Sequence, residues 1–197
     1  MKKGYITLCL LLIATVLLTA CGKKFEAETD WKVENFNYTN QNGDEVSLDN
    51  LKGKPWLAMF IFTNCETVCP PMTANMMDIQ KAFKEKGLKD YNIVGFSIDP
   101  ENDSPKVLKK YLAQYPVPDD SKWNLLTGYS QDEIADLARK SFKTVVKDDP
   151  NSNQVIHGTS FYLVNQEGVV VKSYNGYQNV STDTIASDME ALIEDGK

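Results

Sequence analysis

The sequence contains a single histidine, His157, and a single arginine, Arg139, in 197 residues. One arginine cannot form the cluster of guanidinium groups that would hold phosphate or a peroxide. The formal net charge of −6 argues against nucleic acid as a partner. With only four cysteines besides, the chemistry of this chain has to come from very few residues.

The N-terminus resembles a bacterial lipoprotein signal. Lys2 and Lys3 precede an apolar stretch that is shorter than the roughly 20 residues of a membrane-spanning helix. The stretch closes on Leu-Thr-Ala-Cys at 18–21, which resembles a lipobox. We expect residues 1–20 to be the signal peptide, Cys21 to carry lipid, 21–31 to be a tether and 32–197 to form one domain. The alternative is an uncleaved signal anchor. Both place the domain outside the cytoplasm, and the first places it on the outer face of the cytoplasmic membrane.

Cys65 and Cys69 are the two cysteines left for chemistry. They are separated by three residues, whereas redox disulfides usually have two between them. A disulfide that closes so small a loop would constrain the unfolded chain only weakly. The pair is therefore better explained by redox or metal chemistry, in a compartment where a disulfide can persist.

The pattern of apolar residues and turns predicts an α/β fold. We expect a hairpin around 40–43, buried strands at 56–62 and 92–98, and a short strand at 123–126. We expect helices at 71–86, 105–115, 131–142 and 181–195, a polar loop at 148–156, and a hairpin of strands 159–165 and 169–174. This order predicts a thioredoxin-like fold: a central mixed β-sheet flanked by helices, with an N-terminal β-hairpin extension.

In such sheets, functional sites form beyond the carboxyl ends of the parallel strands. Cys65 and Cys69 follow one such strand, Asp99 ends the next, and His157 precedes the C-terminal hairpin. A position at the start of a helix is expected to lower the pKa of Cys69. Two thiolates suit Cu(I), and an imidazole adds affinity for Cu(II) or Zn(II).

Plainer interpretations stand beside these. His157 could be a hydrogen-bonded loop histidine without a metal. Asp99 could simply begin a helix, or it could orient His157 or offer a weak oxygen ligand. Met72 and Met76 lie four residues apart, and for them packing in the core is favoured over copper binding.

Other classes of cysteine protein fit less well. A thioredoxin-like reductase would be expected to have two residues between its cysteines. A peroxiredoxin needs an arginine beside its reactive cysteine, and Arg139 is remote in sequence. A Cys-His hydrolase would leave the second cysteine unexplained. A structural zinc site needs four ligands as a rule, and the chain offers three.

Three segments together resemble the Sco (SenC) family: Phe-Thr-Asn-Cys-Glu-Thr-Val-Cys-Pro at 62–70, Phe-Ser-Ile-Asp-Pro-Glu-Asn-Asp at 96–103, and Val-Ile-His-Gly-Thr-Ser-Phe-Tyr-Leu at 155–163. The resemblance covers residues 32–195 and is closest to the lipoprotein forms of Gram-positive bacteria. It implies a membrane-tethered, thioredoxin-like copper protein that helps to assemble the dinuclear copper site of cytochrome c oxidase.

The resemblance also implies the roles of individual residues. Copper, as Cu(I) and Cu(II), would be bound by Cys65, Cys69 and His157, with Asp99 supporting the site. The partner would be the copper-site subunit of the oxidase. Members of the family are argued to donate copper, to reduce the cysteines of that subunit, or both. We therefore expect a metallochaperone, with thiol-disulfide oxidoreductase as the alternative.

Overall fold

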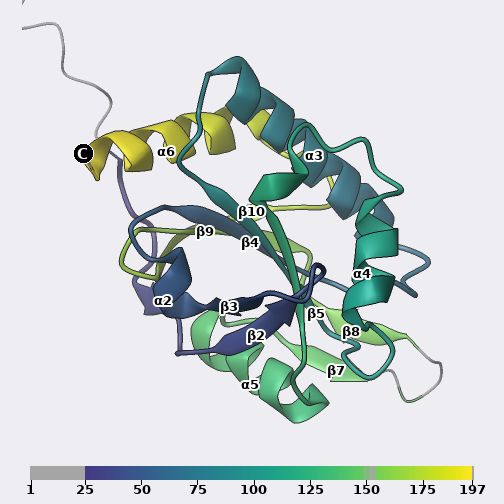
Figure 1. The fold of residues 1–197 in the computed structure, drawn as a ribbon. Helices are drawn as coiled ribbons and strands as arrows, with labels where there is room; N and C mark the ends of the chain where they lie inside the picture. Colours follow the sequence, from purple (N-terminus) through teal and green to yellow (C-terminus); the bar gives the residue numbers. More distant parts are fainter. Residues whose placement is uncertain (1–24, 149, 151–153, 197) are drawn as a thin grey trace, which may run out of the picture.

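The computed structural model describes residues 25–148, 150 and 154–196 (Figure 1). The expected signal peptide and Cys21 lie outside the described residues. Within the described part of the chain, no helix is long and apolar enough to span a bilayer.

The chain forms ten strands and five α-helices within these residues. The strands are β1 (Trp31–Lys32), β2 (Asn37–Asn40), β3 (Glu45–Ser47), β4 (Trp56–Ile61), β5 (Asn92–Ser97), β6 (Trp123–Thr127), β7 (Val146–Asp148), β8 (Val155–His157), β9 (Ser160–Val164) and β10 (Val169–Asn175). The helices are α2 (Leu48–Leu51), α3 (Cys69–Glu85), α4 (Pro105–Leu112), α5 (Gln131–Ser141) and α6 (Thr182–Asp195), and a 3-10 turn, η1, covers Asp120–Lys122.

Eight of the strands form one mixed sheet in the order β1-β10-β9-β4-β5-β6-β2-β3. β4, β5 and β6 are parallel, while β9, β10 and the β2–β3 hairpin are antiparallel to their neighbours. The thioredoxin-like fold, the mixed sheet and the N-terminal hairpin extension are confirmed. The hairpin joins the sheet beside β6.

The core explains this arrangement. Every side chain of β4 is buried, as expected for a strand covered on both faces. α3 and α6 pack together on one face of the sheet and α5 lies on the other (Figure 1). Met72 and Met76 of α3 are fully buried, which confirms that they pack in the core.

The segment before the C-terminal hairpin differs from the expectation. A polar loop was expected over 148–156, but β7 and β8 flank this segment and pair as a separate two-stranded sheet. Each of these strands has three residues, and Ile156 is 54% exposed. So short and exposed a strand gives almost no hydrophobic pattern. As a result His157 lies within a strand, paired with Val146, and not in a loop.

Candidate metal centre

The two cysteines lie where β4 gives way to α3. Cys65 is in the loop between them and is 8% exposed, whereas Cys69 is the first residue of α3 and is fully buried. Both are free thiols. The expected position of Cys69 at the start of a helix is confirmed.

In the first turn of α3, the backbone of one cysteine hydrogen-bonds the side chain of the other. The N-terminal N–H groups of a helix have no partner within the helix. Pro70 and Pro71 remove two of these groups, because proline has no N–H. The N–H of Cys69 donates to the Cys65 sulfur at 3.3 Å. The N-cap residue, Val68, makes no side-chain capping bond, so the Cys65 sulfur takes that place.

His157, the last residue of β8, lies beside the cysteines. Its Nε2 atom lies 3.5 Å from the Sγ atom of Cys69, and its Nδ1 atom lies 2.9 Å from the carbonyl oxygen of Gly158. A carbonyl oxygen can only accept, so Nδ1 carries the proton and Nε2 presents a lone pair to the cysteines. Phe62 stands edge-on to the imidazole, with ring centroids 6.1 Å apart.

The two thiols differ in acidity. The pKa of Cys65 is lowered, mainly because the Cys69 thiol donates a hydrogen bond to its sulfur, and backbone N–H groups donate to that sulfur as well. The pKa of Cys69 is raised, because its thiol is that donor and because it is buried. The expectation of a lowered pKa at Cys69 is therefore wrong. The helix start favours the thiolate of Cys65, since the free N–H points at that sulfur.

The donor set fits a thiophilic metal ion. One ligand atom from each of Cys65, Cys69 and His157 lies within 4.8 Å of the other two. Two sulfurs and an imidazole suit Cu(I), Cu(II) or Zn(II), and hard oxygen-seeking cations such as Mg²⁺ are disfavoured. The hydrogen bond from Nδ1 to Gly158 is the kind of contact that orients a metal-binding imidazole.

A groove opens from this group to the surface. It encloses about 260 Å³ and is lined by Cys65 and His157 together with Phe62, Val68 and Ile156, among others. Cys69 is not part of the lining. A partner that enters the groove therefore meets Cys65 before Cys69.

Among the described residues, the hydrogen bonds of the Asp99 carboxylate and carbonyl go to the turn that follows it and not to the His157 imidazole. Its carboxylate accepts from the side chain of Asn102 at 2.8 Å, and its carbonyl oxygen accepts from the N–H groups of Asn102 and Asp103. These contacts form the turn that leads toward α4. The carbonyl of Gly158, which the sequence did not single out, occupies the Nδ1 side of His157. A supporting role for Asp99 in metal binding stays a prediction.

Asp103 is a residue that the sequence analysis missed. It is fully buried and hydrogen-bonds Thr63 in the cysteine loop and Ser97 at the end of β5. Burial raises the pKa of its carboxyl group. In the sequence, Asp103 looks like a polar residue before a helix, in a run of acidic and amide side chains. Only the register of β4 and β5 shows that it lies between two strand ends.

Arg139 is remote from the cysteines in sequence, and its described ion pair does not involve them either. It lies on α5 and pairs with Asp136 at 2.8 Å, with both side chains largely exposed.

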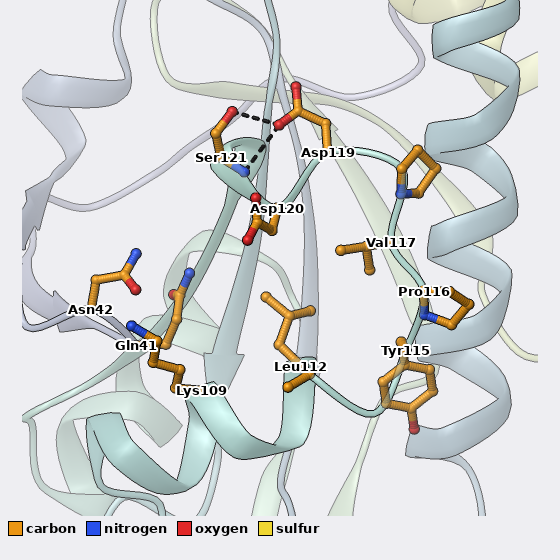
Figure 2. A pocket seen from close by; sticks show the side chains of 12 residues that line it. Gln41, Asn42, Lys109, Leu112, Tyr115, Pro116, Val117, Asp119, Asp120 and Ser121 are labelled. Atoms are coloured by element: carbon orange, nitrogen blue, oxygen red, sulfur yellow. Dashed lines mark hydrogen bonds between the residues drawn. The ribbon is translucent and has the colours of Figure 1, made fainter.

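A larger cavity, of about 720 Å³, lies elsewhere (Figure 2). Its wall combines Gln41 and Asn42 of the β2–β3 turn, Leu112 of α4 and the loop that follows α4, in which Asp119 accepts hydrogen bonds from Ser121. None of its lining residues is a cysteine or histidine. This cavity therefore offers no thiol or imidazole from the described residues to a metal ion.

Fold and site together define a class: a thioredoxin-like protein with a Cys-Cys-His group at the carboxyl end of its central strand. The family model described as SCO1/SenC matches residues 25–194. The chain belongs to this family.

Relatives and solved structures agree with that assignment. The chain is 52% identical over 177 residues to the "SCO1 protein homolog" of Bacillus subtilis, covering 89% of this chain and 91% of the relative. A solved structure of BsSco, described as a member of the Sco family of cytochrome c oxidase assembly proteins with a disulfide switch, is 51% identical with a TM-score of 0.80, over 87% of this chain and 98% of that one. The structure of Bradyrhizobium japonicum ScoI with copper bound is 28% identical with a TM-score of 0.69, over 82% of this chain and 99% of that one.

Proposed function

We propose that this protein is a copper metallochaperone that binds Cu(I) and Cu(II) through Cys65, Cys69 and His157. The observation that carries the proposal is the convergence within 4.8 Å of two neighbouring thiols and of an imidazole that lies far along the chain. Copper bound to a related Sco protein supports the choice of metal. The soft sulfur pair suits Cu(I), and the imidazole adds a ligand that Cu(II) favours.

The proposed acceptor is the copper-site subunit of cytochrome c oxidase. The support is the family, since a 51% identical relative is described as an oxidase assembly protein. Transfer would proceed by exchange of ligands, in which thiolates of the acceptor replace those of this protein. Cys65 would be exchanged first, because it lines the open groove and Cys69 does not.

We further propose that the protein is anchored by lipid on Cys21 to the outer face of the cytoplasmic membrane. The support is the sequence: a short signal that ends on a lipobox-like segment directly before this cysteine. Mass spectrometry of the mature N-terminus, in membranes of a Gram-positive host, tests it. A diacylglyceryl group on Cys21 supports the anchor, and an intact signal peptide contradicts it.

The test of the metallochaperone is transfer. The full-length protein in mild detergent is loaded with copper and mixed with the metal-free copper-binding domain of the oxidase subunit. The appearance of the dinuclear site is followed by absorption and by electron paramagnetic resonance. Faster and more complete filling than from free copper with glutathione supports the proposal. Equal filling from both sources contradicts it.

The alternative function is thiol-disulfide exchange with the cysteines of the oxidase subunit or of another partner. The specific observation in its favour is the asymmetric pair: Cys65 is the more acidic and more accessible thiol, and Cys69 lies behind it. This is the arrangement of an attacking and a resolving thiol. Reduction of the subunit's disulfide by the reduced, metal-free protein, unaffected by His157→Ala, would favour this function.

A further inference from the structure

Asp103 is an acid without a basic partner in the interior of the protein. It is fully buried, and among the buried residues of the described part of the chain it is the only aspartate, glutamate, lysine, arginine or histidine. None of the salt bridges between described residues includes it. A buried carboxylate is costly unless hydrogen bonds compensate it. The contacts that compensate this one therefore indicate what it holds in place.

Those contacts all donate to the carboxylate. The backbone N–H of Thr63 donates to Oδ2 at 3.1 Å, and the Thr63 hydroxyl donates to Oδ1. The Ser97 hydroxyl donates to Oδ2 at 2.6 Å, while its oxygen accepts from the N–H of Asp99. A set of donors without acceptors suits a carboxylate, and an amide at this position would present an N–H group to some of them.

The donors belong to the two strand ends that carry the site. Thr63 lies two residues after β4 ends and two residues before Cys65, and Ser97 is the last residue of β5. The strands are parallel and paired up to Ile61 and Ser97. Beyond that pair, the N–H of Ile98 still donates to the Ile61 carbonyl at 2.9 Å. Beyond this last backbone bond, at the point where the cysteine loop leaves the sheet, the Asp103 carboxylate links the two strand ends.

We propose that Asp103 is the positioning residue of this metal centre: by clamping Thr63 to the end of β5, it fixes the cysteine loop and so sets the separation of the Cys65 and Cys69 sulfurs. The Cys69 N–H holds the Cys65 sulfur at the start of α3 at 3.3 Å, and two further described bonds involve the loop backbone. The N–H of Cys65 donates to the Phe62 carbonyl at 3.3 Å, and Gln154 donates to the Asn64 carbonyl at 3.2 Å. The Phe62 bond lies within the loop, so it cannot fix the loop relative to β5.

The metal-free protein already reports on the clamp. A looser loop would bring the Cys65 and Cys69 sulfurs together less often, and this lowers the equilibrium constant for disulfide formation.

The test uses the full-length protein in detergent and three variants. Asp103→Asn removes the charge and adds an N–H group, and Thr63→Val removes one hydroxyl while keeping the shape of the side chain. Gln41→Ala is the control, since Gln41 is a buried polar residue whose side chain bonds Trp123 and Leu125, away from the cysteines. Should Asp103→Asn fail to fold, Thr63→Val and Ser97→Ala decide the question.

The first measurement is the thiol-disulfide equilibrium of the metal-free protein with glutathione. Cys65 and Cys69 give two electrons and two protons to oxidised glutathione, and a disulfide bond forms as two glutathione thiols are released. We expect the equilibrium constant to fall about tenfold or more in Asp103→Asn, where hydrogen bonds to a charged group are lost, and to fall less in Thr63→Val. The equilibrium constant of Gln41→Ala should match that of the wild type, even if its urea denaturation midpoint falls as far as the midpoint of Asp103→Asn.

The second measurement is the Cu(II) charge-transfer spectrum and affinity of the same proteins. It rests on the proposed function, whereas the glutathione measurement does not. If the wild-type protein bound no copper, the metallochaperone proposal would be refuted. The clamp would still be tested by the glutathione measurement. Positioning predicts a shifted or weakened thiolate-to-copper band in Asp103→Asn. Unchanged disulfide equilibria in both Asp103→Asn and Thr63→Val would overturn the inference, as would equal changes in Gln41→Ala.

Discussion

The Nε2 atom of His157 lies 3.5 Å from the Sγ atom of Cys69, although 88 residues separate them in the chain. The contact depends on β8, which brings His157 back toward the start of α3. Because Nδ1 is committed to the Gly158 carbonyl, Nε2 is the atom left for a metal. The relationship adds an imidazole to the cysteine pair, as the proposed metal site requires.

Replacing His157 should separate metal binding from folding. We expect His157→Ala to lower Cu(II) affinity by about 100-fold or more, because it removes one of three ligands. Cu(I) should be affected less, since two thiolates satisfy it. Competition titrations with chelators for each oxidation state measure both affinities. Ile156→Ala is the control, being an adjacent and largely exposed residue. Unchanged Cu(II) affinity in His157→Ala would remove the imidazole from the site.

The two thiols should react at different rates. In the reduced, metal-free protein at pH 6, we expect iodoacetamide to modify Cys65 about tenfold or more faster than Cys69. Cys65 has the lowered pKa and lines the groove, whereas Cys69 is buried with a raised pKa. Tandem mass spectrometry of the peptide that contains both cysteines gives the two rates.

The pH dependence follows from the same shift. A thiol with a lowered pKa is already ionised at pH 6, so the rate at Cys65 should stay nearly flat from pH 6 to 8. The rate of glutathione, measured alongside, should rise about tenfold per pH unit below its own pKa. A steep rise at Cys65, or faster modification of Cys69, contradicts the assigned asymmetry.

Methionines on α3 should prove structural. Met76→Ala should lower the free energy of unfolding by about 2–5 kcal/mol, because a fully buried side chain leaves a cavity. Urea denaturation measures this. Met77→Ala is a matched control on the same helix, where Met77 is only partly buried, so its cost should be smaller. Copper affinity per folded molecule should be unchanged in both. A weakened copper complex in Met76→Ala would instead make Met76 a ligand.

The capping box of α5 should give acid-sensitive stability. Ser130 and Glu133 bond reciprocally at the start of this helix, and the backbone N–H of Ser130 is the main cause of the lowered pKa of Glu133. A lowered pKa in the folded state means that the stabilisation is present above the unfolded value, 4.5, and is lost as pH falls through the folded value.

Glu133→Gln should therefore be less stable than the wild type at pH 7, and the difference should shrink at pH 3. Thermal unfolding at the two pH values measures it. Glu101→Gln, in an exposed turn, is the control for the loss of one negative charge. A difference that grows on acidification would contradict the capping role.

The sequence predicts the frame of this protein because its signals there are local. Trp56–Ile61 is a continuous apolar run, Ser130 opens a capping box, and Pro70 and Pro71 mark a first helical turn. Such features act within a few residues, so they can be recognised without the fold. The three candidate ligands could also be identified, because the chain contains so few cysteines and only one histidine.

The remainder depends on long-range register. β8 has no pattern of its own and is defined only by pairing with β7. The clamp at Asp103 exists because β4 and β5 end side by side. The wrong pKa direction at Cys69 has the same origin, since it depends on which sulfur the free N–H of the helix meets.

The most direct test of the central claim is X-ray absorption at the copper edge of the loaded, full-length protein. The proposed site predicts, for each Cu(II), scattering from two sulfurs and from one imidazole. The imidazole contribution should be lost in His157→Ala, and one sulfur should be lost in Cys65→Ser. A first shell of oxygen and nitrogen alone, unchanged in these variants, would contradict copper binding by Cys65, Cys69 and His157.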